Sequence, residues 1–556
     1  MKSDRLREKI VAEVLPLVQT PGQYLGGELN AVVKDHAHVR GTLCLAFPDA
    51  YTIGMSHHGL QLLYHLLNAR DDWACERAFT PLPDMEAKLR EHGLPLFSLE
   101  TFTPLAQFDV LGFSLQYELC STNVLTMLDL AGIPLEAERR TEKHPLIIAG
   151  GPGAAVPEPM AHYIDLFVVG DGEEALPAVC DAWLDCRKGS DRRDALAAVA
   201  SRLPFVYVPQ LERKDPVKRA VVRDLDAVPL PTRPVVPYVE CVQDRITLEI
   251  MRGCPGRCRF CQSRPLKHPL RARRVETIVA AAEEAYRNTG YNEIGLLSLS
   301  TSDYPDFDEL MRRLDEVSLP LGVSISVPSL RVNEQWRTVA EKLSTARHSG
   351  LTLAPEAARD ELRQAIGKHL TNDDLMAGCR RAFECGFSRV KLYFMCGLPG
   401  EEPEDLDAII DLSVEIAQLG REVRGRWPVV VTNVSNFVPK PHTPFEREPM
   451  QTGDYFRSAH RRLRERRRPR AVQLKYHDVE TSLLEGVIAR GDRAVGRAIL
   501  RAWQAGARLD AWSDHFEPGR WWEALAAEGV PVDDILHRTR SPDEPLPWDH
   551  IQCRGV

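Results

Sequence analysis

The sequence predicts an α/β protein built from two units, a Rossmann-like doubly wound domain followed by a partial (βα)6 barrel of the TIM type. One observation behind this prediction is that short apolar runs alternate with amphipathic helical stretches along most of the 556 residues. Another is that many of these runs end in glycine or a small polar residue. Strands that are apolar on both faces suit a parallel sheet covered by helices.

The composition agrees with this class. Apolar residues make up 44%, charged residues 27%, and the net charge is −9, an ordinary mix that gives no general reason to expect nucleic-acid binding. No apolar run is long enough to span a bilayer, and the N-terminus lacks the apolar core of a signal peptide. We therefore expect a cytoplasmic protein without a membrane segment, whose thirteen cysteines are not a disulfide framework.

The first unit is expected over residues 41–190, after an N-terminal extension at 1–40. A helix is predicted at 59–68, where apolar residues recur with helical spacing. Apolar runs predict strands at 41–47, 109–115, 145–151 and 166–173. Ligands of such sheets bind beyond the carboxyl ends of the strands, so the glycine turns found there are expected at a binding edge.

The second unit is expected over 241–470, after a Pro-rich linker at 191–240 and before an accessory region at 471–556. Its strands are predicted at 246–251, 293–300, 321–327, 350–355, 388–395 and 428–437. Its helices are predicted at 275–289, 306–317, 334–346, 371–385 and 403–419. In a barrel of this type the site lies at the C-terminal ends of the strands.

A cysteine motif directly follows the first predicted barrel strand. Cys254, Cys258 and Cys261 form a C-x3-C-x2-C pattern. A structural zinc site takes four ligands, commonly as two cysteine pairs, and no second pair lies near in the sequence. Three thiolates on one short loop instead suit a [4Fe–4S] cluster with one iron left open. The alternative is three packed thiols or an incomplete zinc knuckle.

This motif and its place in the barrel resemble the radical SAM superfamily. The resemblance implies that S-adenosylmethionine (SAM) chelates the fourth iron, and that one electron from the cluster cleaves SAM to a 5′-deoxyadenosyl radical. It also implies a reductant of the flavodoxin or ferredoxin type, for which the basic run at 252–274 is a candidate docking surface. The residues that match positions expected to contact SAM are Phe260, Ser298, Ser300, Thr301, Arg331, Glu356, Gly397 and Pro399.

The first unit resembles the cobalamin-binding domain of B12-dependent radical SAM enzymes. Much of the chain is similar to one large family of B12-binding radical SAM proteins, in segments that include FPDAYTIGMSHHGLQLLYHLLN, IIAGGP, PKPHTPF and LPWDHI. The Asp-x-His-x-x-Gly signature of a histidine lower ligand is absent. The alternatives are a Rossmann-like domain without a cofactor and, for His57, a helix-start histidine. The residues expected near cobalamin are Gly54, Met55, His57, Gly59, Ser114, Gly150, Gly151, Gly170, Gly172 and Glu173.

The function expected from these resemblances is cobalamin-dependent C-methylation of a substrate that the sequence does not name, whether RNA, ribosomal protein or small molecule. Methylthiotransfer is an alternative, but that class carries a second cysteine triad, and the N-terminal cysteines here are dispersed. Cobalamin-independent radical chemistry and a non-catalytic Fe–S or corrinoid sensor are further alternatives. A second basic run at 457–470 suggests either a solvated helix face or an RNA contact.

Overall fold

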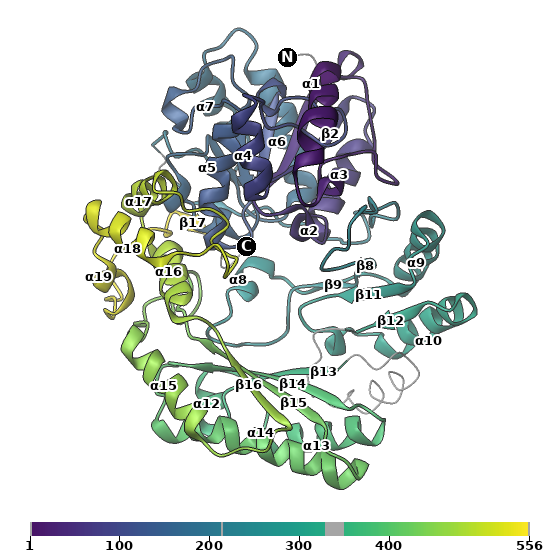
Figure 1. Ribbon diagram of the computed structural model, residues 1–556, viewed down its shortest axis with the longest axis vertical. Coiled ribbons are helices and arrows are strands. Elements are labelled where there is room, and N and C mark those ends of the chain that lie inside the picture. Colours follow the sequence, from purple (N-terminus) through teal and green to yellow (C-terminus); the bar gives the residue numbers. More distant parts are fainter. Residues whose placement is uncertain (1–2, 213–214, 328–349, 554–556) are drawn as a thin grey trace.

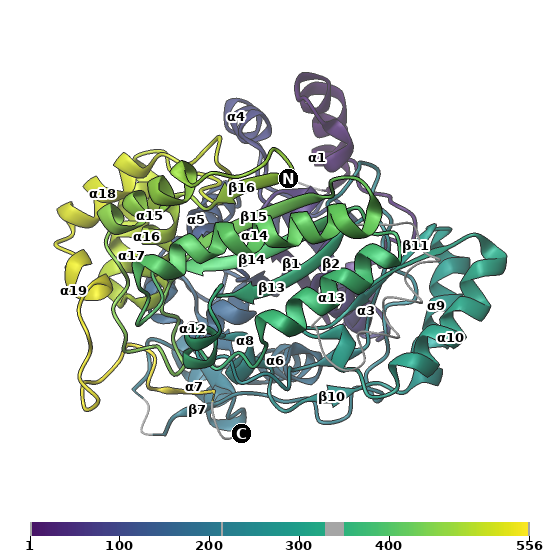
Figure 2. The same cartoon turned by 90° about the horizontal axis from the view of Figure 1, so that it is seen from below.

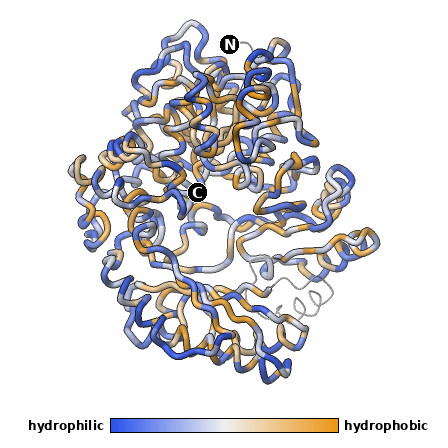
Figure 3. The backbone as a smooth tube through the Cα atoms, in the orientation of Figure 1, coloured by the Kyte–Doolittle hydropathy of each residue, from blue (hydrophilic) through white to orange (hydrophobic). Residues whose placement is uncertain are grey.

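The computed structural model describes residues 3–212, 215–327 and 350–553. Figure 1 shows the N-terminal unit at the top, two groups of barrel strands below it, and the C-terminal segment along one side of both. Apolar residues gather inside the upper unit and along the barrel strands, while the outer helices are largely hydrophilic (Figure 3). None of the helices in the described ranges combines the length and apolarity needed to cross a membrane.

The N-terminal unit is a six-stranded sheet with the order β2-β1-β3-β4-β5-β6. The first five strands are parallel, and β6 runs antiparallel to β5. Its strands are β1 (Gly41–Phe47), β2 (Trp73–Phe79), β3 (Val110–Ser114), β4 (Leu146–Gly150), β5 (Leu166–Val168) and β6 (Val206–Tyr207). This order reverses direction between β1 and β3, the point at which doubly wound sheets form a ligand crevice. The predicted Rossmann-like class is therefore confirmed.

The helices of this unit follow the strands along the chain. They are α1 (Ser3–Lys9), α2 (Tyr51–Gly54), α3 (His58–Asn68), α4 (Pro83–Glu91), α5 (Ser121–Leu130), α6 (Gly172–Cys186) and α7 (Arg192–Arg202). The last of these lies inside the range 191–240 and packs on α6. The N-terminal extension contributes residues to the core, among them Leu6, Ile10 and Val14, each 0% exposed.

Strand β2 was not predicted, because its sequence WACERAF carries two charges in the middle. Both are buried and paired. The Arg77 guanidinium lies 3.0 Å from Glu28 and 2.6 Å from Glu100, and all three side chains are at most 1% exposed. The triad joins the N-terminal extension to the sheet, so a strand that looks polar in sequence is fully buried although it lies at the edge of the sheet.

The second unit contains two parallel sheets, β12-β11-β8 and β13-β14-β15-β16. Their strands are β8 (Ile246–Glu249), β11 (Glu293–Leu297), β12 (Ser324–Ser326), β13 (Leu351–Glu356), β14 (Arg389–Cys396), β15 (Val429–Asn436) and β16 (Val472–Tyr476). These include all six predicted strands, which confirms the partial barrel. Strand β16 follows residue 470 and extends the second sheet by pairing with β15.

Helices cover the outer side of these sheets, as Figure 2 shows for α13 and α14. They are α9 (Val275–Thr289), α10 (Phe307–Ser318), α12 (Asp360–Ala365), α13 (Asn372–Glu384) and α14 (Pro403–Arg424). Local signals explain two of the boundaries. Thr371 and Asp374 form a capping box at the start of α13, and Gly290 ends α9 in a left-handed conformation. The helix predicted at 334–346 lies outside the described residues.

The C-terminal segment connects the two units. Its elements are α15 (Gly453–Glu465), α16 (Val479–Arg490), α17 (Arg493–Gln504), α18 (Pro518–Ala527), α19 (Val532–Leu536) and β17 (Ile551–Gln552). Two of its tryptophans donate hydrogen bonds to the N-terminal unit, Trp503 to Thr126 at 3.0 Å and Trp512 to Asp49 at 2.8 Å. The short strand β17 also pairs with β7 (Val217–Lys218).

The second basic run is engaged in ion pairs along α15. Arg462 contacts Asp407 at 2.7 Å, and Arg466 contacts the same carboxylate at 3.4 Å. Arg457 contacts Glu480 at 3.0 Å. These arginines are partly exposed, with side chains 37–51% accessible, as expected for a solvated helix face packed beside acidic neighbours.

The buried triad predicts a large effect on stability. Replacing Arg77 with alanine leaves Glu28 and Glu100 buried without a counter-charge, and removing one partner from a buried ion pair costs about 3–5 kcal/mol. We expect that loss in the free energy of unfolding, measured by urea denaturation and far-UV circular dichroism. Arg312→Ala, which removes an exposed arginine of α10, is the control and should leave the curve near that of wild type. Equal curves for the two variants would contradict the assignment.

Candidate functional site

A cavity of about 460 Å³ lies between the carboxyl edge of the N-terminal sheet and the first barrel strands. This volume falls within the usual range for small-molecule and cofactor sites. Its N-terminal wall is formed by Leu45, Gly112, Phe113, Ser114, Ile148, Gly150 and Val168, and its barrel wall by Thr247, Glu249, Met251, Arg252, Leu297, Ser298 and Leu299. The cavity therefore occupies the crevice expected from the strand order and also reaches the ends of the first two barrel strands.

Most of the residues predicted near cobalamin line this cavity. They are His57, Gly59, Ser114, Gly150, Gly151, Gly170, Gly172 and Glu173. Gly54 and Met55 lie outside its lining. A Cβ added to Gly54 would be 2.3 Å from the ring of Phe79, and Met55 is 5% exposed with its sulfur accepting a hydrogen bond from Arg77. These two residues belong to the core beneath the site, because at the end of α2 both of them face residues of β2.

Glycine is required for different structural reasons at two positions in the cavity wall. At Gly170, φ is +109° and an added Cβ would lie 2.2 Å from the carbonyl oxygen of Ala220, so the following segment approaches this turn closely. At Gly150 the backbone is not left-handed, and the nearest atom to an added Cβ is the carbonyl oxygen of Val168 at 3.8 Å. The missing side chain at Gly150 thus leaves open space at the end of β4.

The two adjacent histidines at the start of α3 differ in their bonding. His57 is the N-cap residue, and its Nδ1 accepts a hydrogen bond from the Leu60 amide at 3.1 Å. Burial lowers the pKa of His57 to about 4, so the ring is neutral at physiological pH. Burial also lowers the pKa of His58. His58 Nε2 is a buried nitrogen in the cavity wall that has no hydrogen-bond partner in the described parts of the chain.

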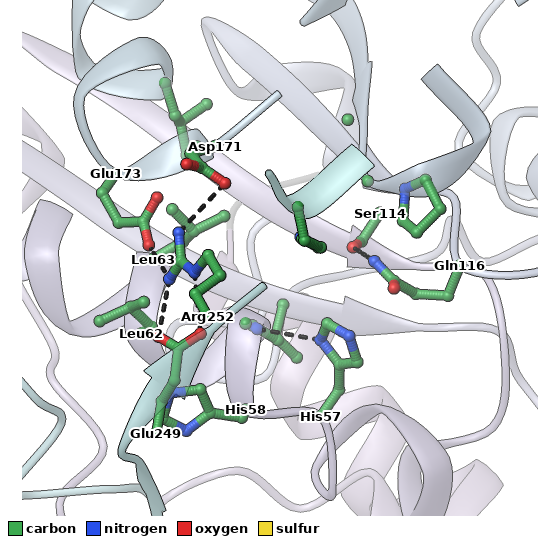
Figure 4. Close-up of a pocket in the computed structure, with 18 of the residues that line it drawn as sticks. His57, His58, Leu62, Leu63, Ser114, Gln116, Asp171, Glu173, Glu249 and Arg252 are labelled. Atoms are coloured by element: carbon green, nitrogen blue, oxygen red, sulfur yellow. Dashed lines mark hydrogen bonds and ion pairs between the residues drawn. The ribbon is translucent and has the colours of Figure 1, made fainter. Parts of the chain in front are cut away.

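An ion-pair network closes one end of the cavity and joins the two units. Figure 4 shows the Arg252 guanidinium between the carboxylates of Asp171, Glu173 and Glu249. The separations are 3.2, 2.5 and 2.7 Å respectively. Arg271 adds a second cation on Asp171 at 2.7 Å. The carboxylates of Asp171 and Glu173, at the start of α6, are thereby paired with arginines of the segment that follows β8.

The predicted SAM contacts after β11 divide into one cavity residue and two turn residues. Ser298 lines the cavity, and its hydroxyl lies 3.0 Å from that of Thr301. Ser300 and Thr301 are 0% exposed. The Ser300 hydroxyl donates to Asp303, so both residues hold the turn in shape. Arg331 lies outside the described residues.

The cysteine loop runs between β9 (Met251–Arg252) and α8 (Ser263–Lys267). Cys254, Cys258 and Cys261 are all partly exposed. Burial raises the pKa of the Cys258 thiol. The nearby Lys368 ammonium lowers that pKa, because a cation stabilises the thiolate. No three His, Cys, Asp or Glu side chains in the described ranges form a site for a single metal ion. A [4Fe–4S] cluster does not require one, because each thiolate binds a different iron.

This loop packs on the carboxyl ends of the next barrel strands. Phe260 contacts an apolar cluster formed by Ala357, Leu362, Ile366, Leu398, Phe437 and Phe445. The Arg259 amide donates to the carbonyl oxygen of Ile366 at 2.8 Å, and its guanidinium lies 4.6 Å from the centre of the Phe445 ring. The segments after β13, β14 and β15 therefore meet at the cysteine loop.

The remaining predicted SAM contacts lie at those strand ends. Glu356 ends β13 at a register shift with φ of +69°, and Lys368 contacts its carboxylate at 3.2 Å. Gly397 follows β14 with φ of +84°, and its amide donates to Glu401 at 2.8 Å. Pro399 lies in the same turn, next to the buried Leu398. The Glu356 carboxylate and the turn at Gly397 thus lie at the ends of β13 and β14, the strand ends on which the cysteine loop packs.

Sequence reasoning missed several residues of the cavity wall. Arg252, Glu249 and Asp171 were not predicted to form a network. Lys267 was noted only as part of the basic run at 252–274, and Gln116 was not singled out. The Gln116 amide donates to the Ser114 hydroxyl at 2.7 Å. Burial lowers the pKa of the Lys267 ammonium beside Asp171. The available signal was the presence of charged residues near the ends of predicted strands. Their pairing could not be predicted, because the partners are far apart in the sequence.

Comparisons with known proteins agree with the cysteine motif. A family model described as "Radical SAM proteins, N-terminal" matches residues 59–209, and the model of the radical SAM superfamily matches residues 248–413. An uncharacterized protein of Methanocaldococcus jannaschii is 28% identical over 456 residues, which span 79% of this chain and 92% of that protein. The ribosomal protein uS12 methylthiotransferase RimO of Pelotomaculum thermopropionicum is 26% identical over 179 residues, 30% of this chain and 39% of that enzyme.

Two solved structures are distant neighbours. The radical SAM methyltransferase TsrM from Kitasatospora setae, solved with cobalamin and a [4Fe–4S] cluster, has 16% identity and a TM-score of 0.49, with 74% of this chain and 77% of that chain covered. The cobalamin-dependent radical SAM enzyme OxsB, solved with aqua-cobalamin, has 12% identity and a TM-score of 0.47, with 89% and 72% covered.

The two radical SAM models together match more than half of the chain, and they cover both the unit before the cysteine loop and the barrel that follows it. The chain therefore belongs to the radical SAM superfamily and is an enzyme that uses SAM with an iron–sulfur cluster.

Proposed function

We propose that this enzyme transfers a methyl group to a carbon of its substrate with the help of cobalamin. The observation that carries the proposal is the shared cavity. One space contains Ser298, the expected SAM contact, together with eight residues expected near a corrin. A cofactor that receives a methyl group from SAM must lie close to it, and a cavity continuous from the sheet edge to the barrel meets this requirement.

The donor set of the loop fits an iron–sulfur cluster. Cys254, Cys258 and Cys261 would hold it, and when bound the cluster supplies the electron that cleaves SAM. Phe260 and its apolar neighbours exclude water from one side of the loop. Glu356 would accept hydrogen bonds from the ribose of SAM, with Lys368 keeping the carboxylate in place.

The cavity also fits cobalamin in two respects. His58 Nε2 is a buried nitrogen without a protein partner in the described residues, which a bound molecule would satisfy. Gly150 leaves open space where any larger residue would intrude. When bound, cobalamin would carry the methyl group, and His57 would remain a neutral helix cap that adds no charge to this wall.

Methylthiotransfer is the second candidate, because named methylthiotransferases are among the relatives. Those matches span only 30% of this chain. The cysteines of the N-terminal unit also lack the second triad expected of that class. Cys44, Cys75, Cys120, Cys180 and Cys186 are dispersed along the sequence and all buried, so they favour structural roles. A sensor without SAM cleavage is disfavoured by the strand-end residues that surround the loop.

The reductant would dock near the cysteine loop. Within the first basic run, Arg252, Arg271 and Arg273 are buried, so they contribute little to an exposed surface. Arg257, Arg259 and Arg264 remain exposed around the loop. Three cations beside the cluster suit an acidic flavodoxin or ferredoxin.

Replacing Cys258 with alanine should abolish cluster retention. The two remaining thiols cannot replace the third ligand, so we expect a loss of most of the iron and of the visible absorbance of the cluster after anaerobic reconstitution. 5′-Deoxyadenosine formation from SAM should fall to background. Cys385→Ala, on a partly exposed cysteine after α13, is the control and should retain both. A full cluster in Cys258→Ala would disprove the ligand assignment.

Replacing Gly150 with leucine tests cobalamin directly. The new side chain enters the cavity without backbone strain, so we expect the protein to fold and bind the cluster but to retain less than about a tenth of the wild-type cobalamin. Cobalamin content is measured by its visible spectrum after reconstitution and gel filtration. Gly519→Leu, at an exposed helix start with open space around its Cβ, is the control. Equal retention in both variants, or none in wild type, would contradict the proposal.

A further inference from the structure

A second cavity of about 200 Å³ adjoins the cofactor cavity and shares two of its wall residues, Gln116 and Pro152. We call it the side cavity. Gln262, the residue after the last cysteine of the loop, forms part of its wall. The C-terminal helix α16 closes it with Ile488 and Ala489. The side cavity therefore touches the cysteine loop, the N-terminal sheet edge and the C-terminal segment together.

The wall of the side cavity is largely apolar with one charged end. Its apolar part includes Leu115, Cys120, Val156, Pro159, Met160 and Ile488. At the charged end, the Lys440 ammonium lies 2.6 Å from Glu118 and 2.8 Å from Glu485. The Tyr117 hydroxyl also donates to Glu485, at 3.0 Å. The side chains of the three charged residues are 18–21% exposed.

This charged end is one positive charge short. Two carboxylates face a single ammonium, so the cluster has a net charge of −1. Lys440 contacts Glu118 through Oε1, and Glu118 Oε2 accepts no hydrogen bond from the described residues. A partly buried carboxylate oxygen with open lone pairs at the wall of a cavity is suited to bind a cationic donor.

We propose that the side cavity binds the substrate, and that the substrate carries a protonated amine or guanidinium on an apolar stem. The cationic group would bind Glu118 Oε2, and the stem would lie along the apolar wall toward Gln262 and Gln116. There its carbon atoms would lie between the cysteine loop and the cofactor cavity, as methyl transfer requires. This assignment rests on the proposed function for its chemistry, but binding itself can be tested without it.

The test is equilibrium binding to the full-length protein in the absence of SAM and reductant. The probes are n-hexylamine and its neutral analogue 1-hexanol, titrated by ligand-observed NMR. We expect hexylamine to bind at least about tenfold more tightly, because only the cation gains the charge-assisted bond. Glu118→Gln should remove that preference while leaving hexanol binding unchanged, which also shows that the variant is folded. Glu91→Gln, an exposed change on α4, is the matched control.

Two further arms complete the design. Ala489→Leu narrows the side cavity and should weaken binding of both probes by about tenfold or more. An acetylated and amidated Gly-Ser-Lys-Ser-Gly peptide distinguishes the source of the cation. Binding equal to or tighter than that of hexylamine indicates a lysine side chain of a protein substrate, and selective binding of the free amine indicates a small molecule.

Equal affinity for the two probes in wild type would overturn the inference, as would full amine preference in Glu118→Gln. Neither result affects cobalamin retention or SAM cleavage, which test the proposed function separately. Conversely, loss of cobalamin in wild type would leave the binding result intact. The two proposals can therefore fail independently.

Discussion

One arginine joins the two halves of this enzyme. Arg252 ends the short strand β9 that follows the first barrel strand, yet two of its three carboxylate partners belong to the N-terminal unit. The Arg252 side chain is only 9% exposed, so water cannot replace the arginine as a partner of these carboxylates. Separating the two units would therefore leave buried charges without a partner. The network therefore sets how the carboxyl edge of the sheet faces the barrel, and with it the shape of the cofactor cavity.

In this geometry the cofactor cavity, the cysteine loop and the side cavity each lie where separate segments of the chain meet. The cofactor cavity lies between the two units, and the cysteine loop lies between the first barrel strand and the ends of three later strands. The C-terminal segment closes the side cavity with α16 and is hydrogen-bonded to the N-terminal unit through Trp503 and Trp512. A segment without a cofactor motif of its own thereby becomes part of the proposed substrate site.

The prediction succeeded where local sequence and structure agree. Apolar runs identified β1, β3, β4, β5 and the six predicted barrel strands, and α9 has the predicted boundaries. It failed at β2, whose central Glu76 and Arg77 look exposed in sequence but are neutralised by partners far along the chain. Gly54 and Met55 also follow the first strand, as a cofactor contact would, but α2 directs them toward the core.

The sequence by itself determined the type of chemistry, because three cysteines on one short loop form a donor set that needs no distant partner to be recognised. It also determined most of the strands, since their apolar runs are local. Only the tertiary structure decided which charges meet, where the two cavities lie, and that Ser298 shares a space with the glycine turns. These properties depend on contacts between residues widely separated in the chain, and no local pattern encodes a distance across a domain boundary.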